Sequence, residues 1–131
     1  MANAKAWKAA EIESMVQKAL AEGKTGANLL KKDEGLGYGL ILTRFKARKA
    51  VPELHEAADD VYYIVKGEGE VTIGGELLEK ESKGPGEWSA KGIANAQKVA
   101  VRAGDVVSIP RGTPHMMGCA GDLDYFIVKV H

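Results

Sequence analysis

The chain contains one cysteine, Cys119, among its 131 residues, which excludes an internal disulfide and a cysteine cluster for zinc. A lone thiol is typical of a reducing compartment, so we expect an intracellular, cytoplasmic protein. No run approaches the ~18 consecutive apolar residues that span a membrane. Residues 1–8 lack the apolar stretch of a signal peptide. The sequence therefore predicts no membrane association.

An excess of charge of one sign is also lacking. Eighteen basic residues balance eighteen acidic residues, so the formal net charge is zero. Nucleic-acid-binding domains usually carry a basic excess, and this chain has neither a basic patch nor a helix-turn-helix segment. These absences disfavour a DNA-binding regulator and predict no nucleic-acid partner. The hydrophobic content of 45% and the length are ordinary for one domain with a core of its own.

The first part of the chain has the periodicity of an amphipathic helix. Apolar side chains recur at the spacing of one helix face, which predicts a helix from about Ala9 to Glu22: Ile12, Met15, Val16, Ala19 and Leu20. Gly23 is well placed to end the helix. We expect this helix to pack on the outside of the remaining domain, because its polar face is mixed in sign rather than basic.

From Gly35 onward the pattern changes to short β-strands separated by glycine-rich turns. Strands are expected at Tyr38–Phe45, Val61–Val65, Val71–Ile73, Val99–Val101, Val106–Ile109 and Tyr125–Val130. Turns are expected at Gly67–Gly69, Gly74–Gly75, Lys83–Gly86 and Arg111–Pro114. The stretch Glu79–Asn95 reads as a long loop or an irregular hairpin. This pattern favours an antiparallel sandwich or barrel, divided into a helix and lead-in at residues 1–34 and a β-barrel domain at residues 35–131.

Several apolar residues of these strands are expected to pack in the barrel core: Phe45, Tyr63, Ile64, Val107, Ile109, Phe126 and Val128. Cys119 is expected to be buried and inert, because no basic neighbour in the sequence would lower its pKa.

The three histidines are the most informative residues. His131 ends the sequence and is expected at the surface. His55 follows Glu53-Leu54 and His115 follows a Pro-x-Gly turn. Residues two apart on a strand point to the same face, so Glu53 and His55 should both point inward. Imidazoles and carboxylates that converge inside a barrel suit a divalent metal such as Mn, Fe, Ni or Zn.

The spacing around His115 matches a known motif, which reads G, five residues, P-x-G, two residues, H, three residues, N. The chain has Gly104, Pro110-Arg111-Gly112 and His115 at these places, and Cys119 stands where the motif has asparagine. Four of the five named positions therefore match.

A second, weaker match surrounds His55, with the pattern G, five residues, H-x-H, three or four residues, E, six residues, G. Here Ala47 replaces the first glycine, Glu53 the first histidine and Asp60 the glutamate, while His55 and Gly67 match. With these two motifs the chain resembles the cupin family. The resemblance implies an all-β, double-stranded β-helix or jelly-roll barrel.

The resemblance also implies a metal site and its ligands. Carried over by position, the ligands are Glu53, His55, Asp60 and His115. Glu53 adds a negative charge where the family has an imidazole. The alternative to a metal ligand is that Glu53 is a solvated carboxylate at an edge of the sheet. Asp60 is one methylene shorter than glutamate, so its alternatives are to orient a histidine ring or to lie in a turn with Asp59.

For function, the sequence favours a metal-dependent cupin that acts on or binds a small organic molecule, with dioxygenase, isomerase and lyase classes all open. Tyr62 shares a strand face with Asp60 and could donate a proton there, although a core tyrosine is the alternative. The rival hypothesis is a non-catalytic, ligand-binding cupin without a metal. The resemblance also implies a homodimer, because small cupins often pair through a sheet face. Strand Val61–Val65 is apolar on both faces, so one face needs a cover, which is either a partner subunit or the N-terminal helix.

Overall fold

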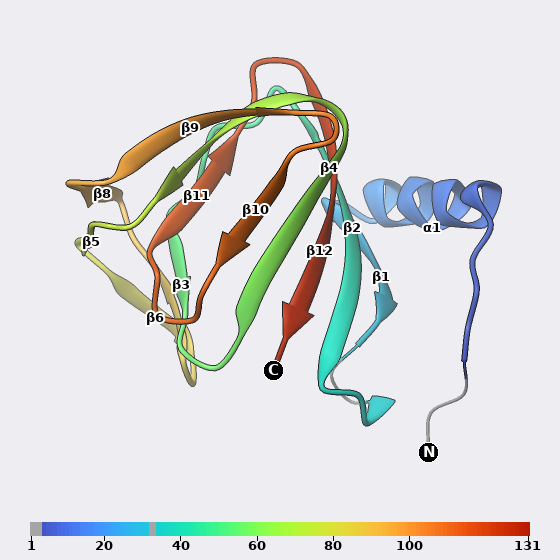
Figure 1. Ribbon diagram of the computed structural model, residues 1–131, viewed down its shortest axis with the longest axis horizontal. Helices are drawn as coiled ribbons and strands as arrows, with labels where there is room; N and C mark the ends of the chain where they lie inside the picture. Colours follow the sequence, from blue (N-terminus) through green and yellow to red (C-terminus); the bar gives the residue numbers. More distant parts are fainter. Residues whose placement is uncertain (1–3, 32–33) are drawn as a thin grey trace.

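The computed structural model describes residues 4–31 and 34–131, so residues 1–3 and 32–33 of the expected lead-in lie outside the described part. The chain forms one N-terminal helix followed by short and long β-strands that curl into a half-open barrel (Figure 1). No helix in the described ranges has the length and apolar character needed to cross a membrane.

Helix α1, Ala9–Ala21, lies outside the barrel as expected (Figure 1). Its apolar face packs against the neighbouring strands β1, Gly26–Leu30, and β2, Tyr38–Lys46. Val16 is fully buried in this contact, in a cluster with Ala19, Ala27, Leu29 and Leu42. Gly23 follows the helix with a φ of +79°, the left-handed conformation that ends helices and favours glycine. Arg44 of β2 ties the helix down through a two-pronged ion pair with Glu13.

Strand β1 was not predicted. It pairs with β2 in antiparallel register, Gly26 opposite Thr43, so the sheet begins before residue 35. Its short sequence, Gly-Ala-Asn-Leu-Leu, carries no alternation and no β-branched residue. It is a strand because β2 offers a hydrogen-bonding edge and α1 an apolar surface. The division of the chain at residue 35 stays a prediction.

The long strand β4, Asp59–Ile73, organises the barrel because it passes through both halves of the curled sheet. In its first part it pairs with β10, Val106–Ile109, and with β12, Asp122–Val130. In its second part it pairs with β9, Gln97–Arg102, and β11, His115–Gly118. The turn predicted at Gly67–Gly69 is therefore wrong. Gly67 takes a φ of +82° beside a register shift, which bends the strand without ending it.

The second half of the sheet continues from β11 to β3, Glu53–His55, then β7, Glu87–Ser89, and β6, Glu81–Gly84. A separate ribbon joins β5, Glu76–Leu78, to β8, Gly92–Ala94. The stretch expected as a loop or irregular hairpin thus contains the hairpin β6–β7 and strand β8. These short strands bring residues near Glu87 beside His55.

The barrel interior is filled by side chains from both halves of the sheet. Phe45, Ile64, Val107 and Ile109 are buried there, as predicted. Tyr63 was expected in the core but is 50% exposed, because it alternates with Tyr62, which takes the inward position. The alternation along β4 therefore directs Asp60, Tyr62 and Ile64 inward.

Candidate functional site

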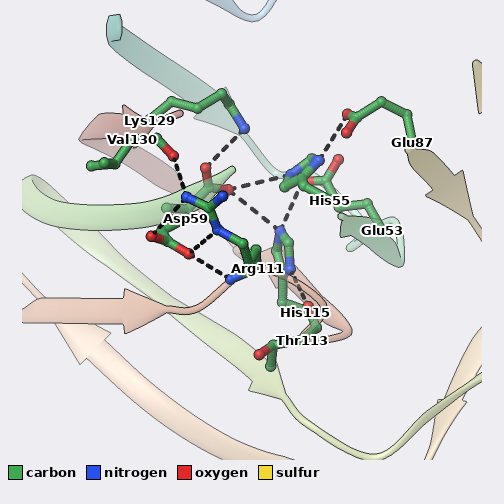
Figure 2. A network of polar contacts seen from close by, with 10 residues as sticks. Glu53, His55, Asp59, Glu87, Arg111, Thr113, His115, Lys129 and Val130 are labelled. Atoms are coloured by element: carbon green, nitrogen blue, oxygen red, sulfur yellow. Dashed lines mark hydrogen bonds and ion pairs between the residues drawn. The ribbon is translucent and has the colours of Figure 1, made fainter. Parts of the chain in front are cut away.

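Glu53 and His55 reach the barrel interior from β3, whose three residues place both side chains on one face. Strand β3 is held between two partners. Glu53 lies opposite His115 of β11, and His55 lies opposite Glu87 of β7. The pairing therefore brings residues 53, 55, 87 and 115 to one place (Figure 2).

The turn before His115 is tied to the strands beside it. The Gly112 amide donates a 2.7 Å hydrogen bond to the carbonyl oxygen of His55, and Gly112 itself has a φ of +79°. The Arg111 amide and Nε donate to Asp59 Oδ1 at 2.8 and 3.0 Å, and Arg111 Nη2 contacts the Val130 carbonyl oxygen at 3.4 Å (Figure 2). These contacts set the direction in which the chain enters β11.

All four predicted metal ligands converge. His115 Nε2 lies 3.3 Å from Glu53 Oε1 and 3.6 Å from Asp60 Oδ2. His55 Nε2 lies 3.3 Å from Asp60 Oδ2 and 3.9 Å from Glu53 Oε1. The donor atoms of Glu53, His55 and His115 are all within 4.8 Å of one another. Asp60 belongs to β4 and is buried, so the alternative of a turn residue is wrong.

The imidazole–carboxylate spacing of these donors is close to that of ligands around one metal ion, although Asp60 is not among the residues whose donor atoms all lie within 4.8 Å of one another. Two atoms bound to the same ion at about 2.1 Å are about 3.4 Å apart in a tetrahedral site and about 3.0 Å apart in an octahedral site. The imidazole–carboxylate distances of 3.3, 3.3, 3.6 and 3.9 Å fall at or slightly above these values. Nitrogen and carboxylate oxygen donors suit Mn, Fe, Ni and Zn.

The outer nitrogen of each imidazole has a partner that fixes the ring. His55 Nδ1 lies 2.8 Å from Glu87 Oε1, and His115 Nδ1 lies 2.9 Å from the carbonyl oxygen of Thr113 (Figure 2). A carbonyl oxygen only accepts hydrogen bonds, so Nδ1 of His115 carries a proton. Both histidines therefore hold their Nε2 atoms toward the two carboxylates. Such outer partners are typical of metal-binding histidines.

His115 Nε2 is a buried nitrogen without a hydrogen-bond partner within the described ranges. The His115 residue is only 1% exposed, so water does not reach it freely. Because Nδ1 holds a proton, a neutral His115 directs the lone pair of Nε2 toward the carboxylates of Glu53 and Asp60. Three electron-rich atoms facing one point repel each other unless a cation lies among them.

Asp60 has a second charged partner that the sequence did not reveal. Lys129 of β12 lies directly opposite Asp60 in the β4–β12 pairing, and its Nζ donates a 2.8 Å hydrogen bond to Asp60 Oδ1. One oxygen of Asp60 thus faces Lys129 and the other faces the imidazoles. Lys129 occupies the last inward position of β12, and only the register shows its proximity to Asp60.

The charges of the cluster shift its pKa values. Burial raises the pKa of Asp60, but hydrogen bonding to His55 and the charge of Lys129 outweigh burial and lower the pKa. Burial likewise opposes ionisation of Glu53, and His115 lowers its pKa overall. Burial lowers the pKa of His55, whereas the carboxylates of Asp60 and Glu53 raise it above its ordinary value. Both carboxylates are therefore ionised at neutral pH.

Tyr62 lies beside the cluster, with its ring centre 6.5 Å from that of His115. It is 1% exposed and also packs against Tyr125, at 4.9 Å between ring centres. Burial, followed by the charge of Tyr125 and of Asp60, raises its pKa well above the ordinary value. The phenol therefore keeps its proton at neutral pH and can donate it, but it is not a base.

The cluster is open on one side. The side chains of Glu53 and Glu87 are 46% and 48% exposed, whereas those of His115 and Asp60 are almost fully buried. Lys129 is intermediate, with 23% of its side chain exposed. Solvent therefore reaches the cluster from the side of Glu53 and Glu87, and Asp60 and His115 lie at its deep end.

Neither the protein-family models nor the curated proteins contain a match to this chain. Solved structures do match it. A predicted oxalate decarboxylase from Thermotoga maritima gives a TM-score of 0.59 at 23% identity, covering 80% of this chain and 77% of that one. A cupin protein from Bacteroides fragilis gives 0.57 at 17% identity, covering 80% and 75%.

The iron(II) form of HppE gives a TM-score of 0.58 at 13% identity, covering 79% of this chain and 49% of that one. The chain also spans 61% of the length of a matched protein from Bacillus halodurans. Identities of this size establish the fold that these proteins share with the chain.

Proposed function

The chain has the fold of the cupin superfamily, and on this premise we propose that Glu53, His55, Asp60 and His115 hold one divalent metal ion inside the barrel. The metal centre would bind or act on a small organic molecule. One observation carries this proposal: the buried, unpartnered Nε2 of His115 faces two carboxylates.

A proton on Nε2 is the alternative cation. An imidazolium proton would make a hydrogen bond to Glu53 or Asp60, yet no contact of His115 Nε2 has hydrogen-bond geometry. A metal ion needs only that the lone pair and the carboxylate oxygens point at a common position. The arrangement around His115 therefore favours a metal over a proton.

A divalent ion bound at this position supplies Lewis-acid chemistry to a ligand oxygen. The protein residues supply the rest. Glu87 and Thr113 hold the two imidazoles in the metal-binding tautomer. Lys129 holds Asp60 so that Oδ2 faces the imidazoles. Tyr62 would donate a hydrogen bond to the bound molecule, because its raised pKa keeps the phenol protonated. The iron(II) form of HppE shows that this fold carries iron in a protein of similar shape.

The alternative is a ligand-binding cupin without a metal. In that case an organic ligand would hydrogen-bond directly to Glu53, His55, Tyr62 and His115. The substitutions of Glu53 and Asp60 for the residues of the family motif keep this alternative open.

Cytoplasmic location is consistent with the single thiol of Cys119.

Variants of the two carboxylates test the ligand set. Asp60→Ala should lower the metal affinity as strongly as loss of a histidine, because one ligand and one negative charge disappear. Glu53→His should keep or increase the metal affinity, because imidazole is a good ligand and one of two crowded anions is removed. Isothermal titration of the metal-free protein measures both. An Asp60→Ala affinity equal to that of the wild type would remove Asp60 from the ligand set.

Metal binding should depend on pH through His55. Its pKa is raised above the ordinary 6.5, so a proton competes with the metal at neutral pH. Affinity should fall as the pH decreases through this raised pKa, and binding should release a proton. The stability of the metal-free protein should show the opposite slope, because a raised histidine pKa contributes stability that is lost as the pH rises through it.

Titrations at pH 6 to 9 in buffers of different ionisation enthalpy measure the released proton, and thermal melts with and without metal measure the two slopes. Glu87→Gln provides the matched variant, since it removes the carboxylate that contacts His55 Nδ1 and leaves all four proposed ligands in place. Metal affinity that is constant over this pH range would contradict the role of His55.

We further propose a homodimer. Helix α1 covers the sheet near Phe126 but leaves Tyr63, Val65 and Val106 exposed by 50%, 44% and 65%. Val106 lies directly opposite Tyr63 on neighbouring strands, so these side chains form one apolar patch. Sedimentation should give twice the chain mass of 14.0 kDa, and Val106→Lys should dissociate the dimer. Leu78→Lys, an exposed leucine outside the patch, is the control. A 14.0 kDa species at micromolar concentration would exclude the dimer.

A further inference from the structure

Lys129 places a positive charge in the proposed metal site. It reaches inward from β12 because it pairs directly with Asp60 of β4, and its Nζ lies 2.8 Å from Asp60 Oδ1. The positive charge of an ammonium group among metal ligands repels the metal ion and so opposes metal binding. An apolar residue at position 129 would avoid that repulsion, so the lysine needs a reason to be there.

Pairing with Asp60 uses only part of the ammonium group. The lysine ammonium has three N–H donors, and among the described residues Asp60 accepts the one hydrogen bond that Lys129 Nζ donates. The Lys129 side chain is 23% exposed, so its remaining donors are not sealed in the core. They are available to a molecule that enters beside Asp60.

The charge of the loaded site points to the same conclusion. Glu53 and Asp60 together balance a divalent ion, because carboxylates that bind a metal are deprotonated and bound histidines are neutral. Lys129 then leaves one positive charge in excess. Glu87 contacts the outer nitrogen of His55 and is not a proposed ligand, and solvent screens its charge because its side chain is 48% exposed. A partly buried site with an excess positive charge favours a ligand with one negative charge.

We infer that Lys129 anchors the carboxylate group of a small organic acid that binds at the metal centre. This inference rests on the proposed function, since the metal supplies part of the positive charge. A carboxylate suits a single ammonium and one charge in excess. A phosphate group carries more negative charge and is usually held by arginine or by several N–H donors. Lys129 would thus be a specificity-determining residue.

Ligand binding to cobalt-loaded protein tests the inference without any activity assay. The visible absorption of Co²⁺ reports changes at the metal, and the probes are acetate and glycolate, with acetamide and glycolamide as neutral counterparts. The wild-type protein should bind each acid at least about tenfold more tightly than its amide. Lys129→Met should remove most of this preference when acid and amide are compared at saturating Co²⁺, so that a change in Co²⁺ affinity does not enter the comparison.

Two further variants separate charge from folding. Lys129→Arg should keep the preference for acids, because it keeps the positive charge. Lys129→Gln should lose it but can still donate a hydrogen bond to Asp60, which preserves the fold if the methionine variant is unstable. Lys91→Met, which removes a surface lysine paired with Glu79, is the control and should behave like the wild type.

The possible failures are distinct. Protein that binds no Co²⁺ overturns the proposed function and this inference together. Protein that binds Co²⁺ but does not prefer acids, or keeps the preference in Lys129→Met and Lys129→Gln, overturns only the role of Lys129. Inorganic phosphate that binds more tightly than acetate and glycolate overturns the assignment of a carboxylate.

Discussion

Replacing His115 with alanine should lower the affinity for a divalent metal by more than about 100-fold, since loss of an outer partner alone typically lowers it 10- to 100-fold. His115 lies at the deep end of the cluster, and its Nε2 is 3.3 and 3.6 Å from the two carboxylates. Without the imidazole, two ionised carboxylates remain in a partly buried site with one histidine. Titration of the metal-free variant with Mn²⁺, Co²⁺ and Zn²⁺ measures the loss.

The same variant also leaves a small cavity in the barrel, so loss of metal must be distinguished from loss of the fold. Met117→Leu is the matched control, because Met117 is a buried neighbour on the same strand and the exchange conserves volume. It should keep both the melting temperature and the metal affinity. A His115→Ala protein that folds and binds metal as tightly as the wild type would show that His115 is a packed core residue.

Gly67→Ala should destabilise the protein by about 4 kcal/mol, through backbone strain and overpacking together. Gly67 has a φ of +82°, and a Cβ atom there would lie 2.0 Å from the carbonyl oxygen of Asp122. That oxygen belongs to the backbone of β12, which pairs with β4 on both sides of the register shift. The two strands would have to separate where β4 passes from one half of the barrel to the other.

Gly104→Ala is the matched control for backbone strain alone. Gly104 has a φ of +96°, but a Cβ atom there would meet nothing within 4 Å. We expect Gly104→Ala to lower the free energy of unfolding by about 1–2 kcal/mol. Urea unfolding of both variants measures the difference. If both variants lost the same free energy of unfolding, the clash with Asp122 would add nothing to the cost of Gly67→Ala. Backbone conformation alone would then explain the glycine at position 67.

Helix α1, strand β10 and the turn before His115 were predictable because each depends on a local sequence pattern. Helix α1 ends at Ala21, one residue from the prediction, and β10 has the predicted bounds, Val106–Ile109. The Pro-x-Gly turn directs His115 inward as its spacing indicated. Predicted ligands that are distant in sequence also converge, because the two motifs fix their positions on the strands.

What could not be predicted depends on register. Glu87 comes from a stretch that resembles a loop, and it reaches His55 only because β7 pairs with β3. Lys129 is one of many lysines, and only the pairing of β12 with β4 places it at Asp60. The Gly67–Gly69 triplet has the composition of a turn, but strands on both sides of β4 keep it within one strand. Tertiary pairing overrides local preference in each case.

Elemental analysis of the untagged protein tests the metal centre most directly. Protein purified without a histidine tag, stripped with a chelator and then incubated with Mn, Fe, Ni or Zn, should retain close to one metal ion per chain after dialysis. The Asp60→Ala, His55→Ala and His115→Ala variants should retain almost none. Wild-type protein that retains no metal after incubation with all four ions would contradict the metal centre.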